Sequence, residues 1–355
     1  MPANGFTAAN TPFTMNVNST KLSSRTRWTI IIGAALMAII GVMGYWTLYA
    51  SNTTRTEIVL VREDMSVTQW LNENQGLVNS RSSFKAAALM KRLHRVKPGR
   101  FSVEAGMSNR ALIDMLRSGR QSPISLRIDD VKTMEELAGK LGRNLQFDST
   151  AFIKHFYNDS LLQQWKCTAE QLPCFIPPNT YEFYWTISPR EFTTRMKGEH
   201  DKFWSAERLS QAEATGLSPM EVTILASIVK AECAKNEEAP IIAGLYMNRL
   251  RIGMRLQSDP TAVFGSKHHI QRVTESALSN DTPYNTYLHD GLPPGPINFP
   301  EQVYLKAVLD AQKHDFVFMC AEAKGTGRHL FATTLGEHET NRRAYIEWLN
   351  ATGIR

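Results

Sequence analysis

This sequence has few cysteines, and its basic and acidic residues nearly balance. Four of its 355 residues are cysteine, glycine shows no repeat period, and the hydrophobic content is an ordinary 43 %. These features exclude a disulfide-rich miniprotein, a collagen-like repeat and a disordered chain. The formal net charge is only +6, and dense Lys/Arg runs with interleaved aromatic residues are missing, so no nucleic-acid partner is expected. The length predicts two soluble units in addition to any anchor.

One long apolar segment lies near the N-terminus. Residues 28–50 contain no charged side chain, and about 20 such residues span a bilayer as a helix. Several basic residues lie just before the segment and only Arg55 lies near its far side, so the positive-inside rule predicts a cytoplasmic tail at residues 1–27. A cleaved signal peptide is the alternative, but its apolar run should be only ~7–15 residues. We therefore expect a single-pass inner (cytoplasmic) membrane protein, with everything after residue 50 extracytoplasmic, or periplasmic.

The cysteines would then lie in a compartment where disulfides can persist. They are Cys167, Cys174, Cys233 and Cys320. Cys167 and Cys174 could close a small loop, but spacing does not fix connectivity, and four free thiols are the favoured interpretation. A zinc site usually combines a CxxC pair with a second CxxC pair or with a pair of histidines. The sequence has no such combination, so no metal site is expected. The adjacent His268 and His269 are interpreted as loop residues, because neighbouring side chains point apart.

The region of residues 57–127 is predicted to be a small α/β module. Strand formers occur at 57–61 and 125–128, a turn at 97–100 leads into a strand, and Ser108 can cap a helix over 109–118. Residues 128–215 form a connecting region, in which Thr133 has capping-box spacing and opens a helix that Gly142 should end. The small α/β module shows no paired titratable groups that would suggest catalysis, and we therefore expect it to be a binding or spacing module.

The clearest helix start in the sequence is at residues 217–222. Ser218 is a predicted N-cap, Pro219 occupies the first helical position, and Glu221 has the reciprocal box position. At about 100° per residue, an apolar face of the following helix carries Val222, Leu225, Val229 and Cys233, and a polar strip carries Thr223, Ser227 and Lys230. Glu232 projects from the middle of the apolar arc.

A carboxylate on a buried face needs a partner or a proton. A structural interpretation pairs Glu232 with one of Arg249, Arg251 or Arg255. The favoured interpretation is catalytic, because burial raises a carboxyl pKa toward values at which the group donates a proton near neutral pH. A second amphipathic helix and polar, Pro-rich loops follow, and such loops are suited to hold a polar ligand such as a sugar.

Four separated blocks in this part of the chain resemble the endolytic murein transglycosylase (MltG-type) family. They are ASIVKAE at 226–232, NRLRIGMRLQSDPT at 248–261, YNTY at 284–287 and GLPPGPI at 291–297. Residues 97–101 with the helix end at Gly119 are similar to the family's LysM-like module, and FIPPNTY at 175–181 is similar to its mid-chain motif. The resemblance implies an α+β fold with one N-terminal membrane helix, a LysM-like module and a catalytic domain at residues 216–355 with a substrate cleft.

The resemblance also implies a function. Family members cleave nascent peptidoglycan strands between N-acetylmuramic acid and N-acetylglucosamine, leave a 1,6-anhydro end and need no cofactor. The family's catalytic Glu falls on Glu232. Lys230, Cys233 and Asn179 depart from the common pattern of Glu, Thr and Asp. Peptidoglycan glycan strands are the implied substrate, the membrane is contacted through residues 28–50, and cell-wall synthases are candidate partners.

One carboxyl group suffices for this mechanism, as acid and then as base. We assign Gln257, Asp259, Tyr284 and Asn285 to sugar binding or to the orientation of Glu232. A glycoside hydrolase is the first alternative; it needs a second carboxylate ~5–5.5 Å or ~6.5–9.5 Å away, for which Asp259 is preferred over Glu237, Glu238 and Glu275. A non-catalytic glycan-binding scaffold of the cell wall is the second alternative.

Overall fold

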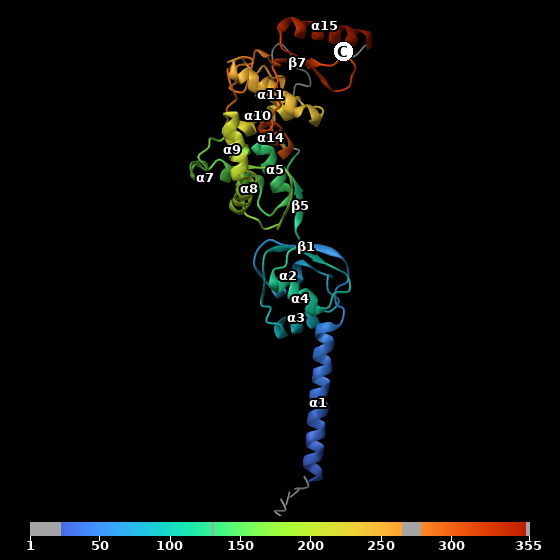
Figure 1. Ribbon diagram of the computed structural model, residues 1–355. Helices are drawn as coiled ribbons and strands as arrows, with labels where there is room; N and C mark the ends of the chain where they lie inside the picture. Colours follow the sequence, from blue (N-terminus) through green and yellow to red (C-terminus); the bar gives the residue numbers. More distant parts are fainter. Residues whose placement is uncertain (1–22, 130, 265–277, 353–355) are drawn as a thin grey trace, which may run out of the picture. The chain divides into compact units, whose positions relative to one another are not determined.

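The computed structural model describes residues 23–129, 131–264 and 278–352, and its chain falls into two compact units (Figure 1). The first unit comprises residues 1–57, 65–96 and 103–118. The second comprises residues 58–64, 97–102 and 119–355. The described part of the chain mixes helices with four two-stranded sheets, so the α+β class is confirmed.

The first unit is mainly helical. Its elements are α1 (Ser24–Tyr49), β2 (Met65–Ser66), α2 (Val67–Glu73), α3 (Arg81–Met90), β3 (Arg95–Val96) and α4 (Asn109–Ser118), with β2 antiparallel to β3. The predicted helix over 109–118 is confirmed: the backbone N–H of Ala111 donates to Ser108 Oγ, and Gly119 follows with a φ of +66°. A positive φ is accessible to glycine without strain, so the helix ends there.

Helix α1 contains 26 residues, none of them buried. It is the one helix of the described residues that is long and apolar enough to cross a membrane. Its length and composition suit either a membrane anchor or a signal segment.

The second unit begins with short strands and a group of small helices. The strands are β1 (Glu57–Val61) paired with β4 (Gly99–Val103), and β5 (Ile124–Arg127) antiparallel to β6 (Thr180–Phe183). The helices are α5 (Met134–Asn144), α6 (Ser149–Phe156), α7 (Asp159–Trp165), η1 (Leu172–Phe175), α8 (Pro189–Phe203) and α9 (Ala206–Thr215). Their core is aromatic, with Phe152, Phe156 and Phe192 fully buried against one another.

Helix α5 begins where it is predicted to, after the N-cap Thr133, but its capping box is incomplete and it ends later than predicted. The backbone N–H of Glu136 donates to the Thr133 hydroxyl as expected, but the Glu136 carboxylate accepts from the N–H of Lys132 rather than of Thr133. Gly142 does not end the helix, which continues to Asn144. A Cβ on Gly142 would lie 2.4 Å from the backbone nitrogen of Ser149, so the glycine permits the close approach of α6 instead.

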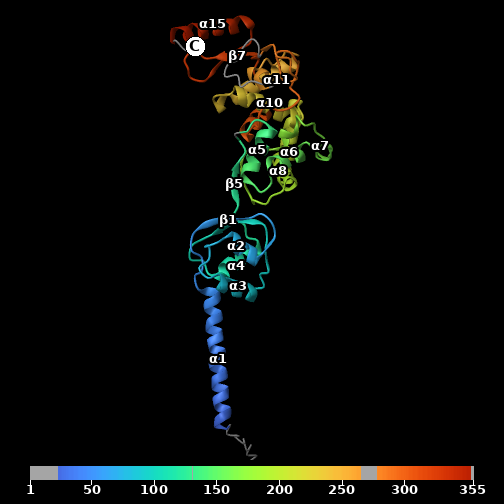
Figure 2. The ribbon, with the colours of Figure 1, turned by 180° about the vertical axis from the view of Figure 1, so that it is seen from behind.

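The C-terminal part of the second unit is built around α10 (Pro219–Glu232). The remaining elements are η2 (Asn236–Glu238), α11 (Ala239–Arg251), α12 (Asp259–Phe264), α14 (Gln302–Leu309), β7 (Phe318–Ala321), β8 (His329–Ala332) and α15 (Leu335–Thr352). Helix α15 lies beside β7 in both views (Figure 2). The predicted capping box is confirmed, because the side chains and backbone N–H groups of Ser218 and Glu221 bond reciprocally.

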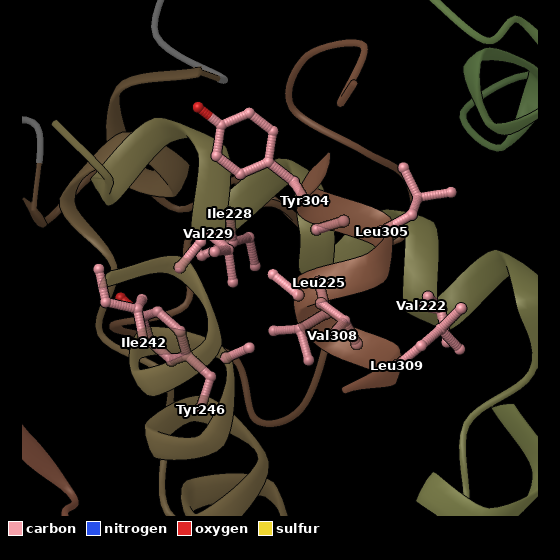
Figure 3. Packing of buried hydrophobic residues seen from close by; sticks show 14 of the residues in the cluster. Val222, Leu225, Ile228, Val229, Ile242, Tyr246, Tyr304, Leu305, Val308 and Leu309 are labelled. Carbon is pink, nitrogen blue, oxygen red and sulfur yellow. The ribbon is translucent and has the colours of Figure 1, made fainter. Parts of the chain in front are cut away.

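Apolar side chains of α10, α11 and α14 interlock in the core of this part. Figure 3 shows Leu225 and Val308 pointing toward each other, with Ile242 and Tyr246 contributed by α11. Burial of this apolar surface stabilises the packing of α10 against α11 and α14.

The polar strip predicted on α10 is covered by other parts of the chain, and the expectation that Lys230 faces solvent is wrong. Thr223 and Ser227 are 3 % and 0 % exposed, because later segments of the chain cover this side of the helix. Ser227 Oγ donates to the carbonyl of Ile224 and accepts from the backbone N–H of Ile297. Lys230 is also half-buried, and its Nζ donates to a backbone carbonyl and to Glu301 at 2.8 Å.

Candidate active site

Glu232 is the last residue of α10, and hydroxyl groups hold its carboxylate. Ser258 Oγ donates a hydrogen bond of 2.5 Å to Glu232 Oε1, and the Tyr246 hydroxyl donates one of 3.2 Å to the same atom. Tyr246 comes from α11 and Ser258 from the segment just before α12. Three elements therefore meet at one carboxylate oxygen.

The hydroxyl of Ser258 is positioned by a hydrogen-bond network between two of the sequence blocks. The Ser258 backbone N–H donates to Thr286 Oγ1 at 3.0 Å, and Thr261 Oγ1 donates to the Ser258 carbonyl at 2.6 Å. The two threonine hydroxyls lie 2.7 Å apart. All three residues are buried, so the segments at 257–261 and 284–287 are fixed to each other beside Glu232.

The electrostatic surroundings favour a proton on Glu232. Burial raises the pKa of its carboxyl above the ordinary value, and the negative charge of Asp259 raises it further. The hydrogen bonds from Ser258 and Tyr246 and the charge of His329 act in the opposite direction, but burial is the largest effect and the pKa stays raised. This is the environment that a general acid requires.

The structural alternative of an arginine ion pair with Glu232 is not formed among the described residues, although the charge of Glu232 acts to raise the pKa of Arg249. Arg249 is buried, and its guanidinium donates to the backbone carbonyls of Val317, Arg255 and Leu256. Arg255 pairs with Asp290, and Arg251 donates to Asn248. Among the residues that the structure describes, the ion pairs include none to Glu232.

Two of the predicted substrate-binding residues are exposed near Glu232. Asp259 is exposed, and its Oδ1 accepts a hydrogen bond of 2.5 Å from the Tyr287 hydroxyl. Burial raises the pKa of Tyr287, and the charges of both Asp259 and Glu232 raise it further, so the two carboxylates act on one phenol. Gln257 is exposed with a φ of +48° and accepts from Arg249.

The other two predicted residues contribute packing and loop geometry. Tyr284 is half-buried with its ring 4.8 Å from that of Phe264, and burial raises the pKa of Tyr284 to about 12. Asn285 is 0 % exposed, and its amide donates to the carbonyls of Leu278 and Asn280. The structure therefore places Asn285 inside the loop and away from the surface.

A second carboxylate in this region has a different partner. Glu238 in η2 is 5 % exposed; its Oε1 accepts from the backbone N–H of His329 at 3.0 Å, and its Oε2 lies 3.2 Å from His329 Nδ1. This contact ties β8 to the turn between α10 and α11. Glu237, in contrast, is exposed and pairs with Arg328.

Sequence reasoning missed the residues that contact Glu232. Tyr246 belongs to the apolar side of the second amphipathic helix, and Ser258 lies between Gln257 and Asp259, which the sequence does indicate as site residues. A polar tip at the end of a buried aromatic ring usually finds a partner, which was the available signal for Tyr246. His329 had no local signal, since it meets Glu238 across 91 residues of sequence.

The Pro-rich block at 291–297 packs against α10, and the backbone N–H of Ile297 donates to Ser227 Oγ. Residues 295–300 are buried, and Asn298 Nδ2 donates to the Ser227 carbonyl. A Cβ on Gly295 would lie 2.0 Å from the carbonyl oxygen of Glu170, so only glycine fits there. The block therefore joins the mid-chain segment to α10.

Several other predictions concern residues away from Glu232. All four cysteines are free thiols. Glu337 accepts from the backbone N–H groups of Thr333 and Thr334 and so caps α15. His268, His269 and Glu275 lie outside the described residues.

The sequence model of the YceG-like family matches residues 59–344. The chain belongs to the YceG-like family. Its resemblance to endolytic murein transglycosylases is also confirmed by named relatives. The protein of that name from Bacillus subtilis (strain 168) is 24 % identical over 289 residues, which cover 77 % of this chain and 80 % of the relative.

A second relative and a solved structure agree with this membership. The endolytic murein transglycosylase of Streptococcus pneumoniae serotype 2 is 25 % identical over 306 residues, covering 77 % of this chain and 55 % of the relative. The chain thus spans about half the length of that protein. A crystal structure of a YceG-like protein from Listeria monocytogenes matches with a TM-score of 0.54 at 24 % identity, over 81 % of this chain and 99 % of that one. This likeness shows that the two chains share a fold.

Proposed function

We propose that this protein is an endolytic lytic transglycosylase that cleaves nascent peptidoglycan strands between N-acetylmuramic acid and N-acetylglucosamine. Family membership and the named relatives make it a lytic transglycosylase. The observation that supports Glu232 as the catalytic group is its environment. It is a carboxyl group with a raised pKa at the end of a packed helix, held by two hydroxyls and without an arginine partner among the described residues.

In the proposed mechanism, one carboxyl group transfers two protons. Protonated Glu232 donates to the glycosidic oxygen as the bond to C1 breaks through an oxocarbenium-like state. The resulting carboxylate then accepts the proton of the muramic acid C6 hydroxyl, whose oxygen closes on C1 to form the 1,6-anhydro ring. The C6 oxygen replaces the leaving sugar's oxygen at C1 and no water enters the products, so the reaction is an intramolecular substitution.

The hydroxyls of Ser258 and Tyr246 have a role in the second half of this reaction. They bond to the carboxylate form and stabilise it, so Glu232 can release its proton even though burial opposes the charge. Both bonds reach Oε1. This leaves Oε2 as the atom that we assign to the proton transfers.

Asp259 and Gln257 are assigned to the sugar, and Asn285 and Tyr284 to the shape of the loop that carries them. The Asp259 carboxylate is exposed and held by Tyr287, which suits stabilisation of positive charge on the sugar ring. Asp259 also supports the hydrolase alternative, because it is the carboxylate whose charge acts on Glu232. The two reactions differ in their products.

The proposed location follows from the substrate and from α1. We assign residues 28–50 as a retained single-pass anchor. The N-terminus is then in the cytoplasm, and the catalytic domain is on the extracytoplasmic, or periplasmic, side of the membrane. Residues 57–127 are proposed as a LysM-like module, and a cleft beside Glu232 is proposed to hold the glycan. Cell-wall synthases stay candidate partners.

Product analysis tests the proposed chemistry. The full chain in detergent is incubated with uncrosslinked peptidoglycan glycan, beside a Glu232→Gln variant, and the released ends are identified by mass spectrometry. Anhydro ends from the parent and none from the variant are expected. Reducing ends would contradict the closure of the anhydro ring and favour the hydrolase, and intact glycan from both folded proteins would favour the scaffold.

A further inference from the structure

The last turn of α1 contacts α4, another helix of the first unit. Asn109 Nδ2 donates to the carbonyl of Thr47 at 2.8 Å, and the Arg110 guanidinium lies 5.0 Å from the ring centre of Tyr49. Directly after the helix, Ser51 forms a β-bridge with the residue before α4. The chain therefore passes from the apolar helix into a folded unit without a free linker.

Helix α3 meets α1 inside its apolar segment. The Cε of Met90 lies 3.6 Å from the position that a Cβ would occupy on Gly44. A hydrocarbon core of about 30 Å corresponds to about 20 helical residues, which places Gly44 near one edge of the core if the span begins at Trp28. Tyr45 and Trp46 lie at this level, where aromatic side chains favour the headgroup region.

The end of α3 exposes apolar side chains at that level. Leu89 and Met90 are 71 % and 53 % exposed. These two adjacent apolar side chains beside the end of an apolar helix suit the headgroup and acyl boundary of a membrane. Both views show α3 beside the end of α1, with α2 farther from it within the unit (Figures 1 and 2).

The same face has a strong excess of positive charge. Residues 81–92 and α4 carry six basic side chains and one acidic side chain. The acid, Asp114, is shared: Lys91 Nζ lies 2.9 Å from it, and Arg110 and Arg117 lie 3.7 Å from it. One carboxylate cannot neutralise three cations, so the face attracts anions such as lipid phosphates.

We propose that the exposed end of α3 is a lipid-binding surface. We call it the α3 face, defined as Lys85, Leu89, Met90, Lys91 and Arg92. Leu89 and Met90 insert at the boundary of the acyl chains, and the basic residues contact the phosphates of anionic headgroups in the leaflet that α1 leaves. This proposal rests on the proposed anchor role of α1. It adds a second membrane contact, which orients the first unit on the bilayer surface.

Photo-crosslinking in vesicles tests this surface. The full chain is reconstituted into vesicles of phosphatidylethanolamine and phosphatidylglycerol, with p-benzoylphenylalanine at Leu89, at Met90, at Ile39 in the middle of α1, or at Thr68 on α2. Irradiation followed by mass spectrometry identifies lipid adducts. We expect adducts from Ile39, Leu89 and Met90, and none from Thr68.

The outcomes separate this proposal from the one on which it rests. Lipid adducts at Ile39 without adducts at Leu89 and Met90 would overturn the α3 face alone, as would crosslinks from Leu89 to a second copy of the chain. Loss of adducts at Ile39 as well would overturn the anchor.

Charge variants test the basic part of the surface. With Lys85→Gln and Arg92→Gln, the adduct yield at Leu89 should fall about fivefold for each charge. The matched control, Lys154→Gln with Lys306→Gln, should leave this yield unchanged.

Discussion

Glu232 and Glu238 lie at the two ends of the turn between α10 and α11, and the protein holds them in different ways. Glu238 is buried against His329, which supplies a backbone N–H and a ring nitrogen that can carry a positive charge. Among the described residues, the Glu232 carboxylate accepts its hydrogen bonds from the hydroxyls of Ser258 and Tyr246, and His329 acts on it through charge without a hydrogen bond. The two regions are adjacent and use the same type of side chain.

The difference shows how a fold selects one carboxyl group for proton transfer. Glu238 joins η2 to β8 through its two contacts with His329, which is a structural role. The hydroxyl donors of Glu232 lower the pKa of its carboxyl less than burial raises it, so that pKa stays above its ordinary value. We interpret Glu238 as the structural member of the pair and Glu232 as the chemical one.

The largest expected effect comes from removing each carboxylate in turn. Glu232→Gln keeps the shape but cannot transfer a proton, so turnover should fall roughly 10²–10⁴-fold, the usual share of general acid–base catalysis. Glu238→Gln retains an acceptor for the His329 backbone, and its turnover should fall much less. The measurement is the rate at which anhydro ends are released at saturating glycan. Equal losses in the two variants would contradict the division of roles.

Stability should respond to the same two variants in opposite directions. The folded state raises the pKa of Glu232 above the ordinary value of 4.5, so the folded state binds more protons than the unfolded state above that pH. Stability therefore falls as pH rises from about 4.5 toward the folded pKa, and Glu232→Gln should raise the melting temperature at neutral pH. Glu238→Gln should lower it, because a weakened buried contact costs about 1–3 kcal/mol.

Thermal unfolding followed by tryptophan fluorescence, at pH 4.5 and pH 7.5, measures both changes. The gain from Glu232→Gln should be larger at the higher pH. A variant that is destabilised at pH 7.5 would show that the charged form of Glu232 is favoured by the fold, against the proposed acid role.

The sequence predicted the helix that carries Glu232 because its signals are local. Ser218, Pro219 and Glu221 mark the start of α10 within four residues, and the apolar period places Glu232 on a packed side. The four sequence blocks predicted the family, which the comparisons confirm. Helix starts and periodic faces depend on neighbours within a few residues, which a single sequence contains.

The contacts that give Glu232 its chemistry were not predictable in the same way. Ser227 is buried because Ile297 and Asn298 cover it from about 70 positions later in the sequence. The Ser258 backbone is held by Thr286 of a later loop, and Glu238 contacts His329 on a distant strand. Polar residues of this kind look solvent-exposed in a helical projection, since their partners come from other elements.

The smallest expected effect, and the sharpest for the comparison, is a pair of opposite shifts in the pH profile. The Ser258 hydrogen bond lowers the pKa of Glu232, so Ser258→Ala should raise that pKa. The charge of Asp259 raises it, so Asp259→Asn should lower it. Because the proposed acid must be protonated to act, the alkaline limb of kcat/KM should move to higher pH in Ser258→Ala and to lower pH in Asp259→Asn.

Ser205→Ala, which removes the N-cap of α9, is the matched control and should leave the alkaline limb in place. If both site variants moved the limb in the same direction, the pH profile would report a group other than Glu232, and the contrast with Glu238 would lose its chemical meaning.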